Sequence, residues 1–506
     1  MKRALSVIIT VLLLAGLMGC AGRLAPDDDV IDIEGSATHA PSGTEALFTE
    51  LPSTELSSSE PSSSEPAQTP QATEQAQTAA PTKAPENEPI PANADEAVAQ
   101  YESYPLGYEP LSRAAVPSNG QVKAPRYSLG ADGVYHSSED SGDNEAVIMF
   151  TGDLMCQTRQ QKAAQTASGY DFNGSFDFVK NLFGKADLVV GNFEATTCPS
   201  APYMSEQIQV DGSPNLNAPA TFAEAIRNAG YDMVVMSNNH NCDAGVRGIY
   251  DTLDTVEEYG LAHTGLFRSA ADTRFIVAEV EGIRIGLLSY ATYFNHKEAH
   301  LTQAGQDVLL NVYSPERVAG DVAAVRSAGA EYVFVYIHWG VEYKNDPTLV
   351  VTVPARERLT GRSVNIRVPL DDQLGIAQEL ADSGVDYIIG SHPHALQPYD
   401  VLTSADGRQV PVIYSMGNFV SHQKMDISND TIVLRVILSR DENGRVTLAK
   451  QGYVPARTHV SFMGRSYTVV PITYPYNQGL SSDEFLPAYR RITEVIGPKL
   501  EIMGTL

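Results

Sequence analysis

Five apolar segments of strand length each end in polar side chains of the kinds that bind metal ions or transfer protons. The segments are residues 146–153, 186–194, 231–240, 331–340 and 386–394. Their polar ends carry Asp153, Asn192 with Glu194, Asn239 with His240, His338, and His392 with His394. In α/β sheets, ligands bind where the carboxyl ends of the strands meet. The sequence therefore predicts an α/β domain in which five loops share one crevice.

The segments between these strands have the spacing of amphipathic helices. Apolar residues recur three and four positions apart in residues 221–230, 245–260, 314–330 and 371–385, and most of these segments end at a glycine. Two hairpins are also predicted, one turning at Glu281 and Gly282 and the other at residues 442–444. This pattern is typical of a mixed sheet with parallel strands in its centre and antiparallel strands outside.

Each polar motif, taken singly, has a simpler interpretation. Gly-Asp after a strand is common in turns, Asn-Asn-His is typical of a helix N-cap, and His-Pro-His can form a rigid turn with solvated rings. Together, however, the motifs supply carboxylate, amide and imidazole groups from separate strand ends. Helix capping does not require that mixture, whereas a site for Mn, Fe or Zn does. We therefore predict a site for one or two divalent metal ions.

The first twenty residues have the pattern of a secretory signal. Lys2 and Arg3 precede an apolar run at residues 4–18, which is shorter than the roughly 20 residues of a membrane-spanning helix. The run ends in Leu-Met-Gly-Cys, which resembles the lipobox of bacterial lipoproteins, so residues 1–19 are predicted to be cleaved and Cys20 to be lipidated. An uncleaved anchor is the alternative. Both interpretations hold the chain at the extracellular face of the cell membrane.

Residues 20–144 have the composition of a tether. Between residues 21 and 100, fifteen acidic residues stand against Arg23 and Lys83, and no periodic apolar pattern is present. Such a segment buries too little apolar surface to offset chain entropy, so we expect it to be disordered and extended by its charge. Tyr and Leu residues at 101–135 leave docking of that stretch on the domain open. The domain is predicted at residues 145–438, with a strand and helix extension packed on it at residues 439–506.

The charge of the chain excludes one class of partner. The 506 residues carry a net charge of −27, and the pI is about 4.7. Binding a nucleic-acid backbone requires clustered Lys and Arg residues that displace its counterions. We therefore expect no nucleic-acid partner.

Six motifs resemble one family. They are GDLM at residues 152–155, GNFEA at 191–195, SNNHNCDAG at 237–245, HWGVEY at 338–343, GSHPHALQP at 390–398 and YSMGNF at 414–419. In this order they are similar to the CapA-type capsule-synthesis family linked to poly-γ-glutamate, over roughly residues 146–438. That family resembles a branch of the calcineurin-like metallophosphoesterases. The resemblance implies a four-layer αββα sandwich with mixed sheets.

The resemblance also implies roles for individual residues. The metal ligands of the family correspond to Asp153, Glu194, Asn239, His338, His392 and His394, with Asn192 as the alternative to Glu194. His240 corresponds to the histidine that assists the leaving group, a general acid outside the ligand set. Asp243 and Glu342 are close to these residues in the sequence, and we expect them to fix histidine tautomers.

The sequence departs from the superfamily pattern at its first motif. That motif normally reads Asp-x-His, whereas this chain has Met155 two positions after Asp153. A thioether is a poor ligand for hard divalent ions. One metal site is therefore expected to be weak or absent, and a site that has decayed into a binding pocket is the alternative.

An insert at residues 347–370 is the second departure. It carries Arg356, Arg358, Arg362 and Arg367 against Glu357 alone. One interpretation is a surface hairpin with solvated arginines. The other is a lid beside His338 that binds substrate carboxylates or phosphates, with Arg356, Arg358 and Arg362 joining Glu342 as substrate-binding residues.

Three cysteines remain after Cys20. Cys156, Cys198 and Cys242 each follow one of the motifs by a few residues, so we expect all three near the rim of the crevice. In an oxidising compartment they allow at most one internal disulfide and one free thiol. Two partly buried, inert thiols and one exposed thiol are the alternative.

Two classes of function fit these features. The first is a metal-dependent hydrolase or transferase that acts on an anionic cell-envelope polymer, for which the resemblance implies poly-γ-glutamate and a polymer synthase complex as partner. The second is a non-catalytic surface lipoprotein that binds or escorts the polymer. The ligand positions favour the first class, and Met155 favours the second.

The lipobox generates a direct prediction. We expect Cys20→Ser to leave the precursor uncleaved or to release the protein from the membrane fraction, because the serine hydroxyl cannot take the thioether-linked lipid. The measurement is immunoblotting of membrane and soluble fractions. Unchanged processing and fractionation of the variant would contradict the prediction.

Overall fold

The computed structural model describes residues 90–103, 106, 120, 122–139, 141–203, 209–210, 213–348, 350–356, 363–369, 372–461, 464, 466–473 and 482–503. All described residues belong to one compact unit of the chain, Ala79–Leu506. The predicted signal peptide, the lipidation site Cys20, and Arg358 and Arg362 lie outside the described residues.

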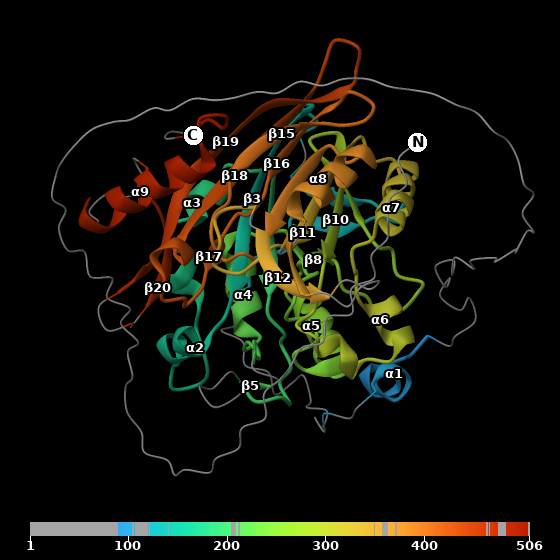
Figure 1. Cartoon of the computed structure of the whole chain (residues 1–506), viewed down its shortest axis with the longest axis vertical. Helices are drawn as coiled ribbons and strands as arrows, with labels where there is room; N and C mark the ends of the chain where they lie inside the picture. Colours follow the sequence, from blue (N-terminus) through green and yellow to red (C-terminus); the bar gives the residue numbers. More distant parts are fainter. Residues whose placement is uncertain are drawn as a thin grey trace, which may run out of the picture. The chain divides into compact units, whose positions relative to one another are not determined.

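The described strands form two eight-stranded sheets (Figure 1). In the first sheet the order is β1 (Tyr127–Leu129), β2 (Tyr135–Ser137), β9 (Ile276–Val280), β10 (Ile283–Ala291), β11 (Tyr332–His338), β14 (Tyr387–Ser391), β16 (Gln409–Ile413) and β15 (Tyr399–Thr403). In the second sheet it is β20 (Tyr467–Pro471), β19 (Val446–Val460), β18 (Asp430–Arg440), β3 (Glu145–Met155), β4 (Leu188–Glu194), β7 (Met233–Val235) and β8 (Ala262–Thr264), with β17 (Asn418–Val420) also paired to β3. Two separate ribbons pair β12 (Val350–Arg356) with β13 (Ser363–Pro369), and β5 (Gln209–Val210) with β6 (Ser213–Pro214).

Both sheets are mixed. In the first sheet β10, β11, β14 and β16 run parallel, and β9 and β15 flank them as antiparallel partners. In the second sheet β3, β4, β7 and β8 run parallel, and β18, β19 and β20 extend the sheet in antiparallel order. The predicted hairpins are β9–β10 and β18–β19. The five strands with polar ends are divided between the sheets, β3, β4 and β7 in the second, β11 and β14 in the first.

The two sheets pack face to face through one apolar core. Alternate residues of each strand face this core, among them Phe150 of β3 and Phe334 and Tyr336 of β11. The rings of Phe150 and Phe334 lie 4.9 Å apart, and the hydroxyl of Tyr336 donates to the main-chain oxygen of Thr151 at 2.6 Å. Because both faces of these strands are covered, their sequences read as continuous apolar runs.

Helices cover the outer face of each sheet. α7 (Pro315–Ser327) and α8 (Gln373–Asp382) share an apolar cluster with β11 and β14. α4 (Thr221–Ala229) and α5 (Gly245–Glu258) share another with β3, β4 and β7. Both α4 and α7 have regular ends: Ser314 caps α7 ahead of Pro315, and Gly230 ends α4 at a φ of 114°. The order of helices, sheet, sheet and helices confirms the predicted αββα sandwich.

The remaining described helices are shorter or lie at the edges of the layers. They are α1 (Ala94–Tyr101), α2 (Thr158–Ala164), α3 (Lys180–Phe183), α6 (Gln303–Leu309) and α9 (Ser482–Ile496), with 3₁₀ turns at Asn173–Phe176, Lys297–His300 and Asp426–Ser428. None of the described helices has both the length and the apolar character needed to cross a membrane.

The predicted end of the tether at residue 144 is wrong. In α1, Ala97 and Tyr101 are buried in the same cluster as residues of α5 and α6, and Asp95 pairs with Arg247 of α5. β1 and β2 join the first sheet through β9. The apolar face of α1 spans only two turns within an acidic stretch, so composition concealed it. The folded domain therefore includes residues from α1 onward.

The predicted domain boundary at residue 438 falls inside β18. The strands that follow, β19 and β20, continue the second sheet, and Phe485 and Ile492 of α9 are buried in the core between the sheets. The C-terminal segment is thus part of the sandwich, because β19 covers the edge that β18 would otherwise leave unpaired.

The packing of α1 predicts a stability effect inside the supposed tether. Tyr101 is 2% exposed, so Tyr101→Ala should lower the free energy of unfolding by about 3 kcal/mol, as large-to-small changes in a core do. Leu129→Ala is the matched control, because Leu129 is 60% exposed and should change that energy by less than about 0.5 kcal/mol. Chemical denaturation measures both. If both variants change the free energy of unfolding by the same small amount, residue 101 belongs to the tether and the prediction is wrong.

Candidate metal centre

The fold brings the predicted ligands together although they come from two sheets. Asp153 lies two residues before the end of β3 and Glu194 ends β4, while His338 ends β11 in the other sheet. The loops after β7 and β14 add Asn239, His240, His392 and His394. All of these side chains are buried, none of them more than 3% exposed. The parallel strands of both sheets therefore end at one internal site.

A β-bulge directs Asp153 into this site. The pairing of β3 with β4 shifts register between Thr151 and Asp153, at Gly152. A Cβ at Gly152 would lie 1.9 Å from the main-chain oxygen of Gly417, so only glycine permits this approach. The side chain of Asp153 accepts hydrogen bonds from Asn192 at 2.8 Å and from the main-chain nitrogen of His392 at 3.3 Å.

Glu194 lies at the centre of the cluster. Its Oε1 is 3.9 Å from Nε2 of His240, 3.9 Å from Nε2 of His338 and 3.8 Å from Nε2 of His394. Both carboxylate oxygens are buried and neither has a hydrogen-bond partner among the described residues. Burial, reinforced by the charge of Asp153, raises the pKa of Glu194 well above its ordinary value. A carboxylate buried in this way is satisfied by a cation.

The donor set fits a divalent metal ion. Asp153, Glu194 and His394 place one ligand atom each within 4.8 Å of one another, and so do Glu342, His392 and His394. Carboxylate oxygens and imidazole nitrogens are common ligands of transition metals in proteins. The described residues thus bring together the ligand atoms that a metal site needs, and the unsatisfied oxygens of Glu194 are the observation that a bound ion would account for.

Neighbouring groups orient the histidines. His338 is 3.0 Å from Oδ1 of Asn239 through Nε2 and 3.0 Å from the hydroxyl of Ser391 through Nδ1. Nδ1 of His394 is 2.8 Å from Oδ1 of Asn418. Burial and the adjacent imidazoles hold the pKa of His338 well below its usual range, which keeps the ring neutral, as a metal ligand must be.

The loop that carries His392 and His394 has a strained backbone. Their φ angles are 95° and 53°, in the left-handed region that side chains rarely adopt. The main-chain nitrogen of Tyr343 donates to the oxygen of Pro393 at 2.7 Å, and the hydroxyl of Tyr293 bonds Nε2 of His392. Strain of this kind persists where surrounding contacts fix it and is frequent at functional sites.

His240 forms a chain with two buried charged groups. Its Nδ1 is 2.7 Å from Oδ2 of Asp243, and Oδ1 of Asp243 accepts from Nζ of Lys297 at 2.6 Å. Burial acts to raise the pKa of Asp243, but His240 and Lys297 outweigh it and hold that pKa below its usual range. A charged Asp243 fixes the proton of His240 on Nδ1, so Nε2 faces Glu194.

The remaining predicted site residues lie at the margin. Nε2 of His394 is 4.0 Å from Oε1 of Glu342, whose side chain is 41% exposed. Arg356 is the last residue of β12. Arg358 and Arg362 lie outside the described residues, so the lid hypothesis stays a prediction.

Met155 and the cysteines are all buried. Met155 is buried in the cluster between the second sheet and its helices, and its expected failure as a ligand stays a prediction. Cys156, Cys198 and Cys242 are all free and buried. The described residues thus contain no disulfide, within the predicted limit of at most one, and the alternative of one exposed thiol is wrong. Burial raises the pKa of Cys198 to about 11, which makes the thiol unreactive.

Sequence reasoning missed several partners of the ligands. Asn418 lies in the YSMGNF motif, so its position was available, but not its contact with His394. Tyr293 follows β10, a parallel neighbour of β11, and the same strand-end rule would have found it. Ser391 ends β14 within the GSHPHALQP motif, so its position was also available, but not its contact with His338. Lys297 gave no signal, because a lysine is ordinarily exposed.

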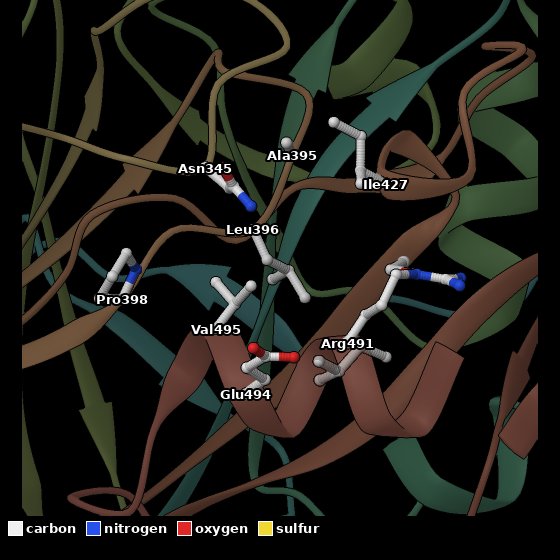
Figure 2. Close-up of a pocket in the computed structure, with 10 residues that line it drawn as sticks. Asn345, Ala395, Leu396, Pro398, Ile427, Arg491, Glu494 and Val495 are labelled. Carbon is white, nitrogen blue, oxygen red and sulfur yellow. The ribbon is translucent and has the colours of Figure 1, made fainter. Parts of the chain in front are cut away.

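A cavity of about 400 Å³ adjoins the loop after His394. Figure 2 shows Arg491, Glu494 and Val495 of α9 facing Leu396 and Asn345 across it. None of the predicted metal ligands lines this cavity. It is therefore a neighbour of the cluster and not its opening.

The fold and the cluster define an αββα protein with a group of potential metal ligands at the strand ends. Residues 147–357 and 364–423 match the family described as Bacterial capsule synthesis protein PGA_cap. That match covers more than half of the chain, and the chain belongs to this family.

Two relatives show the same family. Capsule biosynthesis protein CapA of Bacillus anthracis is 28% identical over 318 residues, which are 60% of this chain and 67% of that protein. PGA biosynthesis protein CapA of Bacillus subtilis (strain 168) is 24% identical over 334 residues, 64% of this chain and 73% of that protein. The predicted membership of the CapA-type family is thereby confirmed.

Solved structures with a similar fold include phosphoesterases. The calcineurin-like phosphoesterase YfkN from Bacillus subtilis is 11% identical, with a TM-score of 0.34 over 69% of this chain and 97% of that chain. The sulfate thiohydrolase SoxB of Thermus thermophilus is 10% identical, with a TM-score of 0.35 over 69% of this chain and 60% of that chain. These scores are low, so the fold assignment rests on the sheet order and layers described above.

The unpaired oxygens of Glu194 predict a test by isosteric replacement. Glu194→Gln should not lower the melting temperature of the metal-free protein, because it removes a buried charge without a partner. It should abolish the stabilisation by Mn²⁺, which for the wild type is about 2.7 kcal/mol at a hundredfold excess over the dissociation constant. Thermal unfolding with and without Mn²⁺ measures both effects.

Glu331→Gln is the control for this experiment. Glu331 pairs with Arg440 away from the cluster, so this variant should keep the stabilisation by Mn²⁺. If Glu194→Gln keeps it as well, Glu194 is not a ligand.

Proposed function

We propose that this chain is a metal-dependent hydrolase or transferase of capsule or poly-γ-glutamate biosynthesis that acts on an anionic polymer of the cell envelope. The observation that carries the proposal is Glu194, whose two buried oxygens lack partners among the described residues while three imidazoles and Asp153 surround it. A purely structural core would not retain this arrangement, because a buried, unpaired carboxylate destabilises the fold.

The ligand set supports one or two ions of Mn, Fe or Zn. Asp153, Glu194, Asn239, His338, His392 and His394 would hold them. When bound, such an ion supplies an activated water and stabilises charge that develops on the reacting oxygens. Met155 contributes no ligand from its place in the core, which supports a single strongly held ion.

His240 is the proposed general acid. Because Asp243 accepts the Nδ1 proton, Nε2 is directed to the cluster, 3.9 Å from Oε1 of Glu194. In hydrolysis the oxygen of water joins the phosphorus or carbonyl carbon and the bond to the leaving group breaks. The leaving group then takes a proton from His240, and the water supplies the proton that restores it.

Glu342 and Tyr343 are the proposed substrate contacts at the mouth. Both are partly exposed, and both neighbour His394, at 4.0 Å for the carboxylate and 5.8 Å between ring centres. Glu342 would orient a substrate donor or a ligand histidine. Tyr343, held at a φ of 62°, would pack against the chain of the polymer.

The proposed location is the extracellular face of the membrane, with lipid on Cys20 as the anchor and a polymer synthase complex as the partner. The lipobox and the acidic segment that follows it support this placement, because a surface enzyme of an exported polymer must work outside the cell. A non-catalytic protein that binds or escorts the polymer is the second candidate, favoured by the absence of a ligand at Met155.

A single substitution separates the two candidates. His240→Ala should retain bound metal, because His240 is outside the ligand set, and should lose about 10²- to 10⁴-fold in rate, the usual worth of positioned proton transfer. His392→Ala should lose both metal and activity. The measurements are metal content and hydrolysis of bis-p-nitrophenyl phosphate and a γ-glutamyl anilide.

If the wild type turns over substrate and His240→Ala does so at the same rate, His240 is not the general acid. Metal binding without turnover of either substrate would favour the escort protein. If the wild type binds no divalent ion at micromolar levels, the hydrolase proposal fails.

A further inference from the structure

A second cavity, here called the basic groove, lies on the other side of Asn418 from the metal cluster. Its volume is about 830 Å³, and its walls are α2, the segment that follows β17, and adjoining parts of β19 and β20. Asn418 connects the two places: its Oδ1 is 2.8 Å from Nδ1 of His394, and its amide nitrogen donates to Gln423 at 3.2 Å. Gln423 lines the groove. The groove therefore begins one side chain away from a predicted ligand.

The groove is positively charged, whereas the chain as a whole is negatively charged. Its described lining includes Arg159, Lys162, Lys424 and Arg457 against the single carboxylate Glu484. Arg457 and Glu484 are 3.1 Å apart, and Arg457 also pairs with Asp426 and Asp430, so these groups neutralise one another.

Arg159, Lys162 and Lys424 are exposed. Within the described part of the chain, Arg159 and Lys424 form no ion pair. An excess of cations in a groove attracts anionic ligands, most strongly at low salt.

The groove also presents an unsatisfied acceptor. Asn429 lines it and is 7% exposed. Its Nδ2 donates to the main-chain oxygen of Met425 at 3.3 Å, while its Oδ1 is buried and has no partner among the described residues. A ligand that satisfies Oδ1 must donate a hydrogen bond. Carboxylates and phosphates alone cannot do so.

We propose that the basic groove binds an acidic polyamide, a linear chain that carries both carboxylates and amide N–H groups. Arg159, Lys162 and Lys424 bind the carboxylates, and Oδ1 of Asn429 accepts an N–H of the chain. This inference rests on the proposed function for the class of polymer and adds a second binding surface for it. The groove holds the polymer beside the cluster. A long polymer therefore stays bound while one bond after another becomes the reacting bond.

The test measures binding to full-length protein in the presence of a chelator, which removes any contribution from the metal. The probe is fluorescent poly-L-glutamate, followed by anisotropy. Polyacrylate and polyphosphate of matched charge are the comparisons, because neither has an N–H donor. Poly-L-glutamate should bind most tightly, and its binding should weaken as salt is raised.

Charge reversal tests the cations. Arg159→Glu combined with Lys424→Glu should weaken binding of poly-L-glutamate by about tenfold or more. Arg445→Glu combined with Lys450→Glu is the matched control, because both residues are exposed near the opposite end of the β18–β19 hairpin, and it should change binding by less than about twofold. If the two double variants weaken the binding of poly-L-glutamate equally, the groove is not its binding site.

Asn429→Ala tests the polyamide. It should remove the preference for poly-L-glutamate over polyacrylate and leave polyacrylate binding unchanged, with the melting temperature as a check on folding. An unchanged preference, or equally tight binding of polyphosphate by the wild type, would overturn the assignment of a polyamide.

These outcomes are independent of the proposed enzyme. If poly-L-glutamate binds in the presence of the chelator and the protein shows no hydrolysis, the groove is supported and the hydrolase proposal fails. If poly-L-glutamate binds only when metal is present, the groove proposal is wrong and the hydrolase proposal is unaffected.

Discussion

A carboxylate buried without a partner is the constraint around which this structure is arranged. Glu194 is fully buried, its oxygens have no hydrogen-bond partner among the described residues, and Asp153 adds a like charge beside it. Such a group costs several kcal/mol unless a cation compensates it. The two-sheet core fixes the backbone on both sides of the cluster, through contacts such as that of Phe150 with Phe334, and so holds ligands from five strand ends in place before any ion binds. A site organised in this way needs little rearrangement on binding, which favours both affinity and catalysis.

Much of this arrangement follows from the sequence, because its signal is repeated. Asp153, Glu194 and His338 each end an apolar run, and the rule that parallel strands end at a common edge applies to every run separately. What the sequence does not contain is the pairing of the runs into two sheets, since a strand buried on both faces has the same apolar pattern in either sheet. The partners of the ligands were missed for a related reason. Lys297 lies in a 3₁₀ turn and Ser391 at the end of β14, and only the folded chain shows which of these segments meet the histidines.

The errors at the domain boundaries have a common physical origin. α1 was assigned to the tether because its two turns supply few apolar residues, and burial of Tyr101 depends on α5 and α6, which are far away in the sequence. The boundary at residue 438 failed because β18 and β19 form a hairpin across it. Composition describes long segments well and short elements poorly. The same limit concealed the basic groove, whose cations Arg159 and Lys424 are widely separated in a chain of net charge −27.

The central claim is that Glu194 and its neighbours hold a divalent metal ion, and anomalous diffraction tests it most directly. Crystals soaked in Mn²⁺ and measured at the manganese absorption edge would show where the ion binds. The account predicts a peak about 2.0 to 2.2 Å from an oxygen of Asp153 or Glu194 and from a nitrogen of His394. A map without a peak there, or with the oxygens of Glu194 hydrogen-bonded to protein groups in place of an ion, would contradict it.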